Sequence, residues 1–159
     1  MKGTDYMNSQ IDYTAIAKVV CDTLSMLGIN AQLKNEVCYS TDCKVSNSVL
    51  AMVGVLGNIK FNMICSMEMK TAENIVAIMM GATEYSMDSI GRSGIAELSN
   101  MLSGSICTAL SVDGTSLDIT TPTVLTGEIV SCTIHSVESR HMEFETQLGL
   151  IRIAFAFET

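Results

Sequence analysis

Three residues of the chain combine types and spacing that could do chemistry: Ser93, Glu97 and Asn100. Positions i, i+4 and i+7 fall on one stripe of an α-helix, because successive residues turn by about 100°. An amide can orient a water molecule, since its carbonyl accepts a hydrogen bond and its NH₂ group donates one. Neither side chain of the Glu/Asn pair is a plausible nucleophile, and the sequence has no Cys-x5-Arg loop and no GxxxxGK loop. Such a pair therefore makes chemical sense only where the substrate supplies the remaining groups.

A helix over residues 86–111 must position this stripe. Its apolar residues cluster on the other side: Ile95, Leu98, Leu102, Ile106 and Ala109. The helix is therefore amphipathic, and Glu97 and Asn100 should point away from the core. Gly104 extends the stripe, and together with Ser93 it leaves a flat face that a partner could approach closely. A solvated polar face without any function has the same pattern, so both interpretations stay open at this point.

Hydrophobic periodicity and turn residues predict the remaining elements. Helices are predicted from the cap candidates Asn8 and Ser9 to Gly28, from Thr71 to Met80 before Gly81, and from near Ser86 to Asp88 to about Ser111 before Asp113-Gly114. Strands are predicted over 31–40, 49–56, 59–65, 117–133 with an interruption at Pro122, 141–148 and 150–157. Two hairpins are expected among these strands, one turning at Gly57-Asn58 and the other around Gly149.

Two halves of the chain resemble each other. The run Leu56-Gly57-x-Ile59-x-Phe61 resembles Leu148-Gly149-x-Ile151-x-Ile153, and Ile16-Ala17 in the first helix corresponds to Ile95-Ala96 in the long one. Each half would be a helix, a strand and a hairpin, with the helix over 71–80 between them. This layout predicts one duplicated α+β domain over residues 1–159, in which long helices cover an antiparallel sheet. Chance matching of apolar pairs remains the alternative.

Composition and charge exclude several classes of protein. The 159 residues are 48% hydrophobic and 16% charged, which fits one domain with a real core and not a disordered chain. The net charge of −8 disfavours binding to nucleic acid and to anionic membranes. No apolar run approaches the roughly 20 residues of a membrane span, and the polar N-terminus predicts no secretory signal.

The cysteines and histidines give no sign of a metal site. None of the six Cys forms a CxxC pair, and the two His, at 135 and 141, lie far in sequence from the nearest Cys cluster. Because no secretory signal is predicted, the cysteines are expected to be reduced thiols in a cytoplasmic protein, most of them buried.

The stripe and its surroundings resemble the signature of a known family. The chemotaxis phosphatases CheC, CheX and FliY carry Asp or Ser, three residues, Glu, two residues and Asn, with a Pro some twenty residues later. Here Ser93-x-x-x-Glu97-x-x-Asn100 matches that pattern, and Pro122 follows after 21 intervening residues, one fewer than in the family. The segment Pro122-Thr123-Val124-Leu125-Thr126-Gly127 also resembles the family's stretch after the helix. The resemblance spans nearly the whole chain, including its duplicated layout.

This resemblance implies an activity and a set of roles. The activity is hydrolysis of the phospho-Asp of a CheY-type response regulator, which ends a chemotaxis or related two-component signal. Asn100 would orient the attacking water and Glu97 would pair with the regulator's Lys. Ser93, Met101 and Gly104 would shape the docking surface around them. The chain itself would bind no cofactor, because Mg²⁺ would sit in the acidic pocket of the regulator.

Within the family the chain resembles CheX most closely. CheC carries the motif in both halves, whereas CheX carries it in one. Aligning Ile16 with Ile95 sets Thr14, Lys18 and Cys21 against the motif, so the first half lacks its Glu and Asn. Similarity to CheX also implies a homodimer joined through the sheet. A non-catalytic module of the same fold, which binds a response regulator or acts as a scaffold, is the alternative function.

Overall fold

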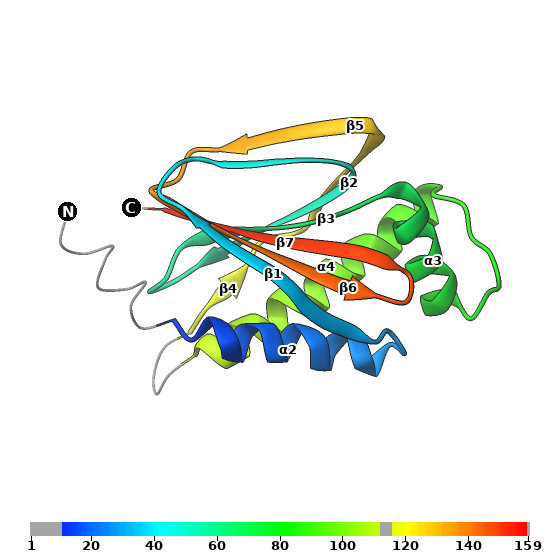
Figure 1. The fold of residues 1–159 in the computed structure, drawn as a ribbon, viewed down its shortest axis with the longest axis horizontal. Helices are drawn as coiled ribbons and strands as arrows, with labels where there is room; N and C mark the ends of the chain where they lie inside the picture. The colour runs from blue at the N-terminus through cyan, green and yellow to red at the C-terminus, as the bar shows by residue number, and fades with distance from the viewer. Residues whose placement is uncertain (1–10, 112–115, 159) are drawn as a thin grey trace.

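The structure is a computed structural model that describes residues 11–111 and 116–158, and its architecture is α+β (Figure 1). The helices are α2 (Tyr13–Met26), α3 (Met69–Met80) and α4 (Ser89–Leu110). The strands are β1 (Ala31–Tyr39), β2 (Cys43–Leu56), β3 (Phe61–Met67), β4 (Asp118–Ile119), β5 (Thr123–Ile134), β6 (Glu138–Thr146) and β7 (Gly149–Phe157). All strand pairs are antiparallel and form a 7-stranded sheet, which confirms the predicted fold class.

The sheet confirms the predicted duplication. Its order is β1-β6-β7-β3-β2-β4, with β5 paired to β2 on the same edge as β4. One half of the chain runs α2-β1-β2-β3 and the other runs α4-β5-β6-β7. Exchanging the halves maps β1 onto β5, β2 onto β6 and β3 onto β7, and this exchange preserves every neighbour relation among these six strands. The sheet is therefore approximately two-fold symmetric about its central β3–β7 pair.

Equivalent glycines turn the two hairpins. Gly57 has φ of +137° and Gly149 has φ of +125°, a region that favours glycine because it carries no Cβ. In the second hairpin space is also limiting, since a Cβ on Gly149 would lie 2.2 Å from Oγ1 of Thr71. The symmetry extends to the register, in which Phe61 pairs with Phe157 and Cys65 with Ile153 across the centre. The sequence echo between the two hairpins therefore reflects a shared backbone requirement.

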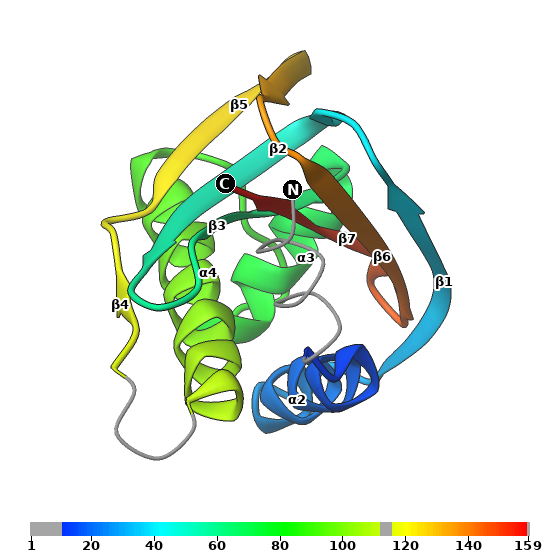
Figure 2. The same ribbon diagram turned by 90° about the vertical axis from the view of Figure 1, so that its left-hand side faces the viewer.

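The helices lie on one side of the sheet and share a core with it (Figures 1 and 2). Side chains alternate along each strand, so one set from β2, β3, β6 and β7 faces the helices. The helices contribute their buried stripes to the same cluster, including Val20 and Leu24 of α2, Ile75 of α3 and Leu98 and Leu102 of α4. This burial fixes the rotation of α4, because its apolar stripe must face the sheet.

The opposite face of the sheet has a second, smaller core. Cys43, Leu50, Ile64, Ala154 and Ala156 are buried there although none of the described helices covers them (Figure 2). Side chains from the beginning of β2 and the last part of β5 pack against this cluster, among them Val45, Val130 and Ile134. A register shift between Asn47 and Val49 interrupts the β2–β5 ladder, and such bulges bend a strand. The beginning of β2 and the end of β5, beyond this shift, thereby cover part of the outer face of the sheet.

Two predicted helix starts need correction. The cap of α2 is Asp12, whose side chain accepts a hydrogen bond from the Ala15 N–H at 3.1 Å, while Asn8 and Ser9 lie outside the described residues. Thr71 does not cap α3, which begins at Met69 directly after β3 and has no side-chain cap bond. Thr71 is instead buried in the first turn against the Gly149 hairpin.

Other predicted boundaries lie closer to the observed ends of the elements. The left-handed Gly81, with φ of +66°, ends α3 as predicted. Pro122 does interrupt the predicted strand, which is divided into β4 and β5. Strand β2 begins at Cys43, earlier than the predicted residue 49, because its first part pairs with the end of β5. The predicted helix break at Asp113-Gly114 lies outside the described residues.

Candidate functional site on helix α4

Helix α4 begins where the sequence predicts. The side chain of Asp88 accepts a hydrogen bond from the Gly91 N–H at 2.8 Å, and an acceptor at this position satisfies one of the free N–H groups of the first turn. The helix then runs to Leu110 and packs against both α2 and α3. Gly94 lies against α3, since a Cβ there would be 3.4 Å from Val76 Cγ2. Helix α4 is therefore held on three sides by the sheet and its two neighbours.

The remaining side of α4 carries the predicted stripe. Ser93 and Glu97 are exposed, and Asn100, Met101 and Gly104 are half-buried. The structure thus brings all five predicted residues onto one outward face of one helix. Pro122, which belongs to the resemblance, lies on a different element and immediately precedes β5.

Glu97 and Asn100 are free to bind something outside the chain. Neither side chain has a hydrogen-bond or ion-pair partner among residues 11–111 and 116–158. Ser93 differs, because its Oγ donates to the Ser89 carbonyl at 3.0 Å within the helix. The backbone carbonyl of Gly104 accepts a similar bond from Thr108 Oγ1. The carboxylate and the amide are therefore the available polar groups of the stripe, and Ser93 is better placed to shape the surface than to react.

Gly104 has no internal reason to be glycine. A Cβ at this position would meet no atom within 4 Å of the described chain, in contrast to Gly91, where it would lie 3.1 Å from the Ser86 carbonyl. Glycine inside a helix costs about 1 kcal/mol relative to alanine. The fold alone does not account for this cost, so the missing side chain fits a surface that another molecule approaches closely.

The equivalent face of α2 is satisfied within the chain. Lys18 Nζ is 2.7 Å from Asp22 Oδ2, an exposed pair on neighbouring turns. Cys21 is half-buried, and burial together with the Asp22 carboxylate raises the pKa of its thiol, opposed by a hydrogen bond from the Leu33 backbone. Thr14 is exposed at the start of the helix. This face offers neither a free carboxylate nor a free amide at the aligned positions.

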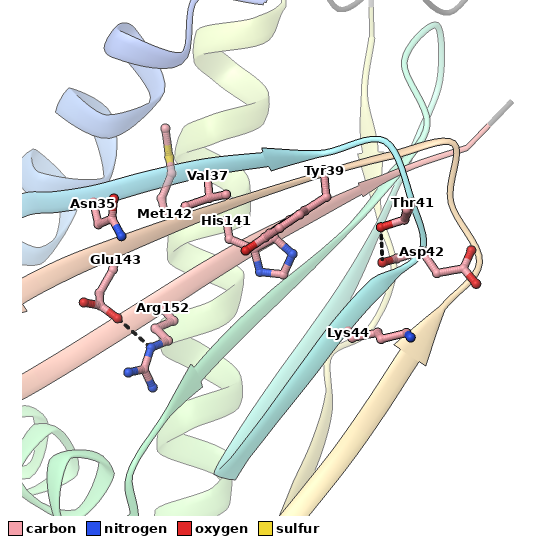
Figure 3. A pocket seen from close by; sticks show the side chains of 10 residues that line it. All are labelled: Asn35, Val37, Tyr39, Thr41, Asp42, Lys44, His141, Met142, Glu143 and Arg152. Carbon is pink, nitrogen blue, oxygen red and sulfur yellow. Dashed lines mark hydrogen bonds and ion pairs between the residues drawn. The ribbon is translucent and has the colours of Figure 1, made fainter.

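A rival site lies on the outer face of the sheet, away from α4. A hollow of about 510 Å³ lies among side chains of β1, β2, β6, β7 and the turn between β1 and β2. Figure 3 shows the side chains that line it. Two of its charged groups pair with each other, since Arg152 Nε is 2.7 Å from Glu143 Oε2. Tyr39 packs edge-on against His141 with ring centroids 5.3 Å apart. The lining thus combines a paired Arg and Glu, a packed aromatic pair and the side chains of Asp42 and Lys44.

A Cys–His pair at this hollow also fails as a nucleophile. Cys43 Sγ lies 4.0 Å from His141 Nε2. Burial raises the pKa of the Cys43 thiol to about 11, and burial also lowers the pKa of His141. A reactive cysteine needs the opposite shift, toward a thiolate at neutral pH. The pair is therefore a packed structural contact.

The described residues also bear on metals and membranes. Within 11–111 and 116–158 no group of three or more His, Cys, Asp or Glu side chains could hold a metal ion. None of the helices in that part of the chain has the length and apolar character of a membrane span.

A duplicated antiparallel sheet with helices on one side defines a class of protein, the CheC, CheX and FliY chemotaxis proteins. A chemotaxis protein CheX from Desulfovibrio desulfuricans has this fold with a TM-score of 0.78 and 24% identity, over 91% of this chain and 99% of that one. The CheX–CheY–BeF3–Mg²⁺ complex from Borrelia burgdorferi matches with a TM-score of 0.68 and 21% identity, over 94% and 100% of the two chains. FliY from Thermotoga maritima matches with a TM-score of 0.64 and 18% identity, over 90% and 88%.

The amino-acid sequence identifies one family within this class. The family described as chemotaxis phosphatase CheX matches residues 49–145, which is more than half of the chain and includes the whole of α4. The chain belongs to the CheX family. A comparison with curated proteins gives no significant match.

Proposed function

We propose that this chain hydrolyses the phospho-Asp of a CheY-type response regulator and thereby ends a chemotaxis or related two-component signal. The observation that carries the proposal is the Glu97/Asn100 pair, which lies on an outward helix face of a CheX-family chain with no partner among the described residues. The relative from Borrelia burgdorferi was solved as a complex with CheY, BeF3 and Mg²⁺, which supports a partner of this kind.

In the proposed reaction a water oxygen attacks the phosphorus of the regulator's acyl phosphate. The bond from phosphorus to the aspartyl oxygen breaks, which releases the Asp carboxylate and inorganic phosphate, and the water proton passes to phosphate or solvent. Asn100 holds the water in line through its amide. Glu97 pairs with the regulator's Lys and fixes the register, a contact that gains strength once the complex excludes water. The Mg²⁺ belongs to the regulator.

The docking surface in this proposal consists of the remaining predicted residues. Ser93, Met101 and Gly104 surround the pair on the same helix face. Their small or flexible side chains allow the regulator to approach the helix backbone, which a water held by the short Asn100 side chain requires.

The direct test is phosphate release from a CheY-type regulator with excess acyl-phosphate donor and Mg²⁺, with wild type beside Asn100→Ala. Loss of one positioned hydrogen-bonding group typically lowers a rate by about 10²–10³-fold. We expect wild type to accelerate release and Asn100→Ala to lose that acceleration without change in thermal stability. Near-normal turnover by Asn100→Ala would overturn the assignment. Binding without acceleration by wild type would favour the non-catalytic module.

We also propose a homodimer joined at a sheet edge, and the two edges differ. Strand β1 carries Lys34 at a register shift, and a bulge with a lysine protects an edge from pairing. The end of β5, residues 129–134, has no charged residue, and Ile129 is 77% exposed. We therefore assign the dimer contact to β5. Sedimentation equilibrium should give a dimer for wild type and a monomer for Ile129→Lys with Ser131→Lys, and a monomeric wild type would refute this assignment.

A further inference from the structure

One exposed apolar side chain on α4 is unexplained by the fold. Ile90 is 55% exposed at the second residue of the helix. It lies seven residues before Glu97, so by helix geometry the two side chains point within about 20° of the same direction. Ile90 therefore belongs to the outward face that carries the Glu97/Asn100 pair. Arg92, the neighbouring exposed residue, points away from this face at about 140° from Glu97.

The distance along the helix matches the size of a protein–protein contact. Ten residues separate Ile90 from Asn100, which is about 15 Å along the axis at about 1.5 Å per residue. A standard interface buries about 800 Å² on each partner, equivalent to a disc with a radius of about 16 Å. A regulator centred over the Glu97/Asn100 pair would reach Ile90, whose exposed apolar surface would then be buried.

We infer that Ile90 is a docking residue for the response regulator and that the regulator's footprint extends from the pair toward the amino-terminal end of α4. The inference rests on the proposed function and names the part of the surface that sets affinity. The matching group on the regulator is an apolar or aromatic side chain beside its phosphorylation pocket. Ile90 touches neither the reacting atoms nor the water in this arrangement, so it affects binding and not the chemical step.

The position of Ile90 makes a clean substitution possible. Asp88 caps the helix, so residue 90 lies in its first turn, where a carboxylate interacts favourably with the helix dipole. Ile90→Asp should therefore fold as well as wild type, and Ile90→Ala removes the apolar surface without adding charge. Met26→Asp is the matched control, because Met26 is 80% exposed at the end of α2 and lies on a different helix.

The experiment measures the Kd for a CheY-type regulator loaded with beryllofluoride and Mg²⁺, together with kcat and KM for its phosphorylated form. We expect Ile90→Asp to raise Kd and KM at least about tenfold, Ile90→Ala to raise them less, and both to leave kcat unchanged. Met26→Asp should match wild type. If wild type is active and Ile90→Asp binds equally well, or if it lowers kcat alone, this inference is wrong and the proposed function stands. If wild type neither binds nor dephosphorylates the regulator, the proposed function fails and the inference fails with it.

Discussion

Helices α2 and α4 hold equivalent places in the two halves of the domain, yet the polar side chains on their outward faces differ in whether they have partners. On α2 the charged residue of the face, Lys18, has a partner one turn away in Asp22. On α4 the corresponding Glu97 has none among the described residues, and neither has Asn100. The backbone is shared, while the charged side chain of one face is paired within the described chain and the Glu/Asn pair of the other is not.

The two helices differ in their outward faces and not in how they are buried. Both helices bury an apolar stripe against the same sheet, so burial alone does not distinguish them. The distinction lies in unpaired polar groups and in a glycine that the fold does not need. Gly104 meets nothing within 4 Å at its Cβ position. The glycine lowers helix stability relative to alanine, and the described part of the fold shows no contact that requires it.

The largest expected effect comes from exchanging the two pairs. Glu97→Lys with Asn100→Cys gives α4 the residues of α2, and we expect regulator dephosphorylation to fall at least about 100-fold, or about 2.7 kcal/mol in activation free energy. The reverse exchange, Lys18→Glu with Cys21→Asn, should leave the rate unchanged because the α4 pair is intact. Phosphate release measures both variants. A double variant of α4 that keeps its activity would show that Glu97 and Asn100 do not account for the difference between the two helices.

An intermediate effect is expected from the carboxylate alone. Glu97→Ala should weaken binding to a regulator that carries a phosphoryl mimic by about 2 kcal/mol, since it leaves the regulator's Lys without its partner in the complex. The turnover number at saturating regulator should change much less. Calorimetric titration gives the affinity, with Lys18→Ala on α2 as the control that should bind like wild type. Unchanged affinity would assign Glu97 to the chemistry instead of to docking.

The smallest effect has opposite signs for stability and for activity. Gly104→Ala should raise the free energy of unfolding by about 1 kcal/mol, because it removes the flexibility of glycine in a helix without creating a clash. It should also weaken regulator binding by keeping the partner away from the helix. Thermal denaturation and binding are measured together, beside Gly94→Ala on the side of α4 that faces α3. A Gly104→Ala protein with full affinity would show that the face needs no close approach.

The repeat in the sequence predicted much of the fold. Gly57 and Gly149 mark equivalent hairpins because both need a positive φ, a requirement that reads directly from residue type. The alternation around them gave the strands, and the long helix followed from its apolar spacing. The prediction that Thr71 caps a helix was wrong. A Thr before a helical pattern is an ordinary cap signal, but here the buried Thr71 side chain packs against the Gly149 turn.

The stripe on α4 was predictable because helix geometry alone places residues at i, i+4 and i+7 together. Its lack of internal partners was not, since partners such as Asp22 for Lys18 or the Leu33 backbone for Cys21 depend on how neighbours pack. Ile90 was also missed, although its spacing of seven residues from Glu97 was visible. The apolar cluster on the outer face was not predicted from the sequence. Its cover depends on the register shift between β2 and β5, which no local sequence pattern indicates.

The interleaved order of the sheet has a consequence for how the chain is made. Strand β1 pairs with β6 alone among the described strands, and one contact between them joins Cys38 to Glu138, 100 residues apart. At about 5–20 residues per second, a ribosome needs roughly 5–20 s to synthesise that interval. During this time β1 has no strand to pair with, and loop closure over such lengths slows folding further. The first half of the domain therefore leaves the ribosome without its pairing strands. It becomes stable only when the hairpin of β6 and β7 has been synthesised.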